Sequence, residues 1–130
     1  HTLSLHDALP ISGHPLHAST LSEKGKALSL RGLAQDGDPL ALEIFDLQAR
    51  AMGFAVATGC MAYDPSHVII GGGLMDPDAT TAEFRTRYLE GIRKSATEYL
   101  WVKPEEISLH EASLGERAQA VGAALLARNL

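Results

Sequence analysis

The stretch SHVIIGGGLMDP, from Ser66 to Pro77, joins a short β-branched run to three consecutive glycines. Residues 68–70, Val-Ile-Ile, favour a buried strand. Glycine inside a regular element costs about 0.5–1 kcal/mol of stability relative to alanine. A run of three therefore indicates that the backbone needs residues without side chains at these positions. That requirement is either a turn with unusual φ or a ligand close against the chain. On spacing alone, the structural turn is favoured.

Glycine-rich turns between a strand and a helix can present backbone N–H groups to phosphate or ribose. Two common versions are absent from this sequence. There is no Gly-x-Gly-x-x-Gly fingerprint of dinucleotide-binding folds, and no Gly-Lys-Ser/Thr of a P-loop. Any nucleotide site here therefore has to be of another kind.

The segment before the strand predicts a long helix. Asp38 is a good N-cap, and Pro39 suits the first helical position, where its missing N–H does no harm. Apolar residues then recur at three- and four-residue spacings. Asp64 precedes a proline, which disfavours helical conformation at Asp64 itself. We therefore interpret Asp64 as a helix terminator in preference to a magnesium ligand.

Beyond Met52 this helix carries small side chains nearly all round. We expect that half to pack against a sheet, with Gly53, Ala57 and Gly59 permitting close approach. Cys60 is interpreted as a small hydrophobic residue that packs in the same place.

Further elements complete an α/β pattern. We predict helices over 22–34 and from Thr80 or Thr81 to 100, a second strand in 107–112, and an apolar closing helix over 116–130. The order is helix, long helix, strand, long helix, strand, helix. Such alternation predicts a layered α/β fold of short strands and long helices.

Composition narrows the function classes. The 130 residues suit one domain or part of a larger one, and the net charge of −5 without a basic run argues against broad binding to nucleic acid. A single cysteine excludes an intramolecular disulfide and a Cys-only zinc cluster. Apolar stretches are too short and interrupted to span a bilayer, so we expect a cytoplasmic protein.

Residues 1–11 are treated separately from the fold. Thr2 to Ile11, TLSLHDALPI, resembles the translation of a common short-read sequencing adapter. We expect an artefactual tail over 1–11, with the authentic sequence over 12–130. On this interpretation the gene begins further upstream, and the chain lacks its amino-terminal portion.

The chain from about Gly37 to Arg128 resembles the carboxy-terminal half of the ROK family. The most specific segments are GDPLA, DPSHVIIGGGL and SLGERAQAVGAALLA. This family comprises bacterial sugar kinases, among them glucokinases, and related sugar-responsive repressors. The resemblance implies a partial ribonuclease H-like domain of the actin-like ATPase superfamily. It also implies that Gly71, Gly72 and Gly73 line the adenosine side of an ATP site.

Several family motifs are missing from this sequence. They are the Asp-x-Gly-Gly-Thr phosphate loop, the Asn-Asp pair with the catalytic base, and the Cys-rich zinc motif. We therefore predict no catalytic residue and no metal ligand in this chain, with ATP and Mg²⁺ belonging to the complete protein. The presence of a zinc site is left open, and His14 and His17 are assigned no role.

Three functions compete. The first is the ATP-side, carboxy-terminal part of an ATP-dependent kinase of hexoses or amino sugars. The second is the sensor domain of a ROK-family repressor. Only this alternative implies a nucleic-acid partner, which an upstream helix-turn-helix would bind. The third is a structural α/β module without a nucleotide. The resemblance implies a homo-oligomer, and the short, interrupted apolar stretches predict no membrane partner.

Other candidate residues have a structural interpretation. Asp76 and Asp78 are read as loop or capping residues, Gly115 and Gly122 as close-packing positions of the last helix, and His110 as a histidine on a strand surface.

Overall fold

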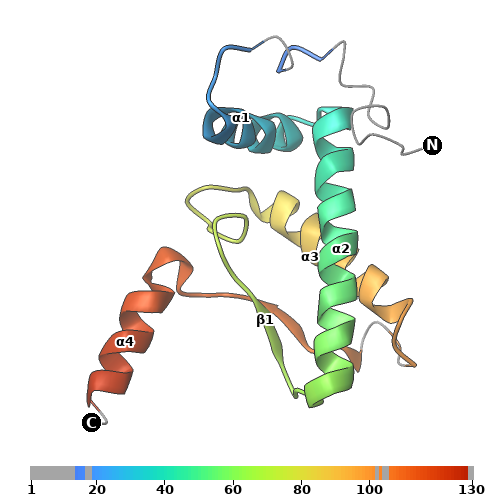
Figure 1. The fold of residues 1–130 in the computed structure, drawn as a ribbon, viewed down its shortest axis with the longest axis vertical. Helices are drawn as coiled ribbons and strands as arrows, with labels where there is room; N and C mark the ends of the chain where they lie inside the picture. The colour runs from blue at the N-terminus through green and yellow to red at the C-terminus, as the bar shows by residue number, and fades with distance from the viewer. Residues whose placement is uncertain (1–13, 17–18, 102, 104–105, 129–130) are drawn as a thin grey trace, which may run out of the picture.

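The computed structural model describes residues 14–16, 19–101, 103 and 106–128 (Figure 1). In chain order, the helices and strands of this part are α1 (Glu23–Gln35), α2 (Pro39–Tyr63), β1 (Val68–Ile70), α3 (Ala82–Thr97), β2 (Leu109–Glu111), the short 3-10 helix η4 (Gly115–Arg117) and α4 (Ala118–Arg128). The predicted order and the α/β class are both confirmed. The predicted tail over 1–11 lies outside the described residues.

Local sequence fixes both ends of α2. The Asp38 carboxylate accepts a hydrogen bond from the Ala41 N–H at 2.9 Å, and Pro39 occupies the first turn. At the other end, Asp64 has a φ of 47°, and its N–H donates to the Cys60 carbonyl oxygen at 2.9 Å. A left-handed residue after the last turn is a common helix ending. The prediction that Asp64 terminates the helix is confirmed.

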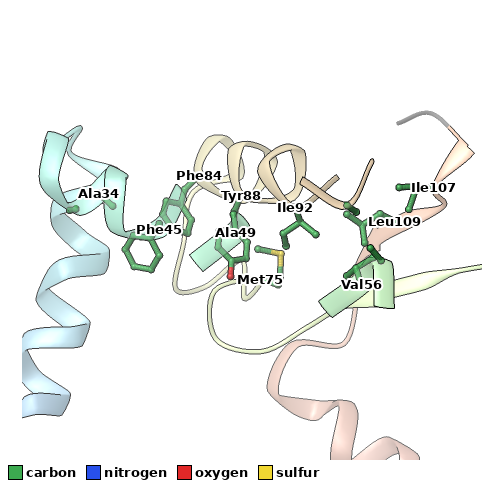
Figure 2. Packing of buried hydrophobic residues seen from close by; sticks show 13 residues of the cluster. Ala34, Phe45, Ala49, Val56, Met75, Phe84, Tyr88, Ile92, Ile107 and Leu109 are labelled. Atoms are coloured by element: carbon green, nitrogen blue, oxygen red, sulfur yellow. The ribbon is translucent and has the colours of Figure 1, made fainter. Parts of the chain in front are cut away.

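The core lies mainly between α2 and α3, which pack along much of their lengths (Figure 2). Phe45 of α2 meets Phe84 of α3 edge to face, with ring centroids 5.1 Å apart. Ile92 and Met75 are the largest fully buried side chains of the described residues. Burying a side chain of this size contributes roughly 1.5–3 kcal/mol to folding.

Gly53 allows α2 and α3 to approach each other closely. A β-carbon added at Gly53 would lie 2.6 Å from both the Ile92 carbonyl oxygen and the Ser95 Cβ. Close approach at Gly53 was predicted, but its partner is a helix and not a sheet. At Gly59 a β-carbon would meet nothing within 4 Å, so the prediction is wrong there.

The two strands form a parallel pair with Val68 opposite Leu109, Ile69 opposite His110 and Ile70 opposite Glu111. Leu109 is buried, Val68 and Ile70 are half-buried, and Ile69 is 66% exposed. Parallel sheets normally have both faces covered. In the described part of the chain one face of this pair is open, which is why the expected burial of the strand holds for one side only.

The last helix lies apart from the α2–α3 pair (Figure 1). Gly115 has a φ of 51° and turns the chain toward α4. None of the described α4 side chains is buried, and Leu126 is 71% exposed. A β-carbon at Gly122 would meet nothing within 4 Å, so the predicted close packing there is not present in the described structure.

Among the described residues, no helix is both long enough and apolar enough to cross a bilayer.

Candidate functional site

The glycine turn, Gly71–Gly73, follows β1 directly and is exposed. Gly72 has a φ of 100°, a conformation that L-residues rarely adopt, and its carbonyl oxygen accepts the Met75 N–H at 2.8 Å. A β-carbon at Gly71 would lie 3.2 Å from the Ala112 Cβ, which is tight. Backbone conformation therefore explains Gly72, and packing explains Gly71.

Gly73 has neither explanation. Its φ lies outside the left-handed region, and the nearest atom to an added β-carbon is the Arg31 Nη1 at 3.8 Å. At Gly72, too, an added β-carbon would meet nothing within 4 Å. The absence of side chains here leaves a bare stretch of backbone open to a ligand.

The chain that leaves the turn is firmly anchored. Met75 is 1% exposed in the core. The buried Thr80 hydroxyl lies 3.0 Å from the carbonyl oxygens of both Leu74 and Asp76, and the Ala79 N–H donates to the Asp76 carbonyl oxygen at 3.0 Å. A backbone held in this way is preorganised, which lowers the entropic cost of binding.

A second turn lies beside the first. Because the strands are parallel, their carboxyl ends meet at one edge, and the Ala112 N–H donates to the Ile70 carbonyl oxygen at 2.9 Å there. The Asp76 Oδ1 lies 3.8 Å from the β-carbon position of Gly115 and accepts the Asp78 N–H at 3.0 Å. In open α/β sheets, ligands bind outside the carboxyl ends of the strands. The glycine turn, Asp76 and Gly115 together form the candidate site.

Arg31 adds a positive charge to this site. From α1, its Nη1 donates to the Gly73 carbonyl oxygen at 3.2 Å. Sequence reasoning missed Arg31, as it missed Met75 and Thr80 as anchors of the turn. The leucine pattern of α1 offers no signal for Arg31, because its partner lies in another element.

The remaining candidates fall outside this site or have structural roles. The His14 Nε2 lies 3.5 Å from the Asp38 Oδ2, far along the chain from the glycine turn, and His17 lies outside the described residues. Cys60 is half-buried against the core, as expected. His110 is exposed on β2, as predicted. Within the described residues, no three His, Cys, Asp or Glu side chains gather to hold a metal.

Three groups with shifted pKa values lie on α2 and α3 or next to them. The hydrogen bond from the Ala41 N–H is the main cause that lowers the pKa of Asp38; desolvation opposes it, and His14 lowers this pKa further. Hydrogen bonds from the Arg87 guanidinium to Asp46, at 2.7 and 3.1 Å, raise the pKa of Arg87. Burial raises the pKa of Tyr88. These shifts reflect helix ends, ion pairing and core packing, and none marks an acid or base at the site.

Comparison with known proteins adds an independent result. The ROK family model matches residues 9–130. Glucokinases of Streptomyces coelicolor and Streptomyces lividans are each 35% identical to the chain over 109 residues, which is 81% of this chain and 31% of theirs. The chain thus spans about a third of the length of these curated relatives. No solved structure gives a significant match.

Proposed function

The chain belongs to the ROK family, and from that premise we propose that it is the adenosine-binding part of an ATP-dependent sugar kinase. Family membership also supplies the finer fold class, a partial ribonuclease H-like domain of the actin-like ATPases. The two relatives bear the name glucokinase. The reaction of the complete protein would be phosphoryl transfer from ATP to a hexose or amino-sugar hydroxyl.

The observation that supports a nucleotide-binding role for the turn is Gly73. Neither its φ nor its packing requires a glycine at this position. Gly71, Gly72 and Gly73 would form a flat backbone wall against which the adenosine lies. The anchors at Met75 and Thr80 support this by holding the wall in place before ATP arrives. Arg31 holds the Gly73 carbonyl oxygen and brings a cation near the nucleotide.

The rest of the chemistry belongs to segments that this sequence does not contain. Phosphoryl transfer needs metal-assisted charge stabilisation and a base near the sugar hydroxyl. ATP and Mg²⁺ are therefore cofactors of the complete protein, where the missing phosphate loop and aspartate would act. A second copy of the chain is the partner that the family resemblance implies.

The test is to express the complete gene product and to measure ADP release with Mg²⁺, ATP and a panel of hexoses and amino sugars. We expect ADP release that depends on one class of sugar. Sugar binding without ATP binding or ADP release, from a protein that melts cooperatively, would contradict the kinase and favour the repressor. Binding of neither ligand would favour the structural module.

A further inference from the structure

Two histidines face each other on the open side of the two-stranded sheet. Side chains alternate between the faces of an extended chain. His67, just before β1, therefore shares a face with Ile69, and Ser108, just before β2, shares a face with His110. The parallel register places Val68 opposite Leu109, which brings His67 beside Ser108 and His110 one step further along. The exposure of Ile69 and His110 identifies this as the open face.

The ring nitrogens of this pair are close together. The His67 Nδ1 lies 3.2 Å from the His110 Nε2, and the Ser108 Oγ lies 2.9 Å from the former and 2.8 Å from the latter. The ring centroids are 5.2 Å apart, farther than the nitrogens, so the rings diverge behind the two facing atoms. Facing nitrogen lone pairs repel each other unless a proton or another cation lies between them.

We propose that His67 and His110 form a two-imidazole site for a divalent transition-metal ion, with zinc as the ion to test. Zn–N bonds of about 2.0–2.1 Å at a tetrahedral angle separate two ligand nitrogens by about 3.3–3.4 Å. The observed 3.2 Å between the His67 Nδ1 and the His110 Nε2 is close to this separation. Imidazole nitrogen suits zinc, nickel and copper, whereas Mg²⁺ prefers oxygen.

The rest of the coordination sphere is open to solvent. In the metal-free chain the Ser108 hydroxyl lies within hydrogen-bond distance of both nitrogens. It would give up these contacts when the nitrogens bind zinc, because each ring nitrogen has a single lone pair in the ring plane. Two protein ligands leave positions for water or for a ligand from another molecule. This site lies at the amino-terminal end of the strands, and the glycine turn follows their carboxyl ends, so the two sites are separate.

The experiment uses the full chain in a background where the four other histidines, His1, His6, His14 and His17, are replaced by glutamine. Titration calorimetry with Zn²⁺ should show saturable binding, with Mg²⁺ producing none. His67→Gln and His110→Gln should each weaken Zn²⁺ binding by at least about tenfold, since even changes to groups behind a metal ligand typically cost 10–100-fold. Ser108→Ala should keep the binding.

Metal-free melting curves serve as the control for folding, because all three positions lie on the open face. Zn²⁺ should raise the melting temperature of the background chain and of Ser108→Ala, but not of the two histidine variants. The proposal is overturned if the background chain does not bind Zn²⁺. Binding that survives either histidine substitution, in a variant that melts like its parent, would also overturn it.

Discussion

The α2–α3 pair and α4 differ in how far their apolar side chains are buried. Along α2 and α3, Phe45, Ala49, Phe84 and Ile92 are buried against each other (Figure 2). Along α4, Leu125 and Leu126 are 47% and 71% exposed, although α4 is more apolar than α3. The first region is held by contacts within the described chain. In the second, the apolar side chains of α4 are not buried by any of the described residues.

This difference explains where the candidate site lies. The glycine turn lies at the border of the packed region. Met75 anchors its outgoing chain in the core, and Gly71 lies against Ala112 in the segment that leads to α4. A rigid support next to an open surface is the arrangement expected of a binding site. The packed half therefore maintains the shape of the turn, and the open half leaves room for a ligand.

The largest expected difference between the two regions is in the free energy of unfolding of two variants, Ile92→Ala in α3 and Leu126→Ala in α4. Ile92 is 0% exposed, and removing its side chain should lower the free energy of unfolding by about 2–5 kcal/mol. Leu126→Ala should change it by less than about 0.5 kcal/mol, because an exposed side chain loses little on truncation. Urea unfolding followed by circular dichroism measures both. Equal losses would show that α4 is packed in solution.

A second pair tests the contrast within one helix. Gly53→Ala places a β-carbon 2.6 Å from the Ile92 carbonyl oxygen, a backbone atom that cannot move alone. We expect a loss of about 1–3 kcal/mol in the free energy of unfolding, as for other overpacked sites. Gly59→Ala on the same helix meets nothing within 4 Å and should stabilise by up to about 1 kcal/mol through helix propensity. A neutral Gly53→Ala would contradict the close approach of α2 and α3.

The smallest effect concerns the start of α2. The pKa of Asp38 is lowered in the folded chain from its ordinary value of 3.8, because the ionised carboxylate accepts the Ala41 N–H. The resulting stabilisation is fully present above that ordinary value and is lost as the pH falls through the lower folded pKa. Asp38→Asn keeps a capping oxygen without this titration.

Melting temperatures of the two chains between about pH 6 and about pH 2 provide the measurement. The difference between parent and Asp38→Asn should shrink or reverse in favour of Asn at the acid end. A constant difference across that range would mean that Asp38 does not gain its stabilisation from ionisation.

The sequence predicted those features whose causes are local. Asp38, Pro39 and Pro65 bracket α2 within a few residues of its ends, and Thr81 caps α3 through its hydroxyl. The partner of Gly53 could not be predicted, because it lies on another helix. At the site, the sequence located the glycine turn, but the contact of Gly71 with Ala112 and that of Gly73 with Arg31 depend on tertiary packing.

The open face of β1 also escaped prediction. A β-branched run suits a buried strand, and the sequence does not say which segments would cover it. His67 and His110 face each other because of the register between β1 and β2. This register cannot be predicted from the sequence of either strand alone.

The ATP affinity of the complete protein with alanine at Gly72, Gly73 or Gly37 shows whether the glycine turn lies against the adenosine. Gly72 and Gly37 have φ values of 100° and 86° with open space around both, so alanine strains the two backbones alike. Gly73→Ala adds a methyl group without such strain. We predict at least about a tenfold loss of affinity, or about 1.4 kcal/mol, for Gly72→Ala and Gly73→Ala, and unchanged affinity for Gly37→Ala. Unchanged ATP affinity in all three folded variants would contradict a glycine wall against the adenosine.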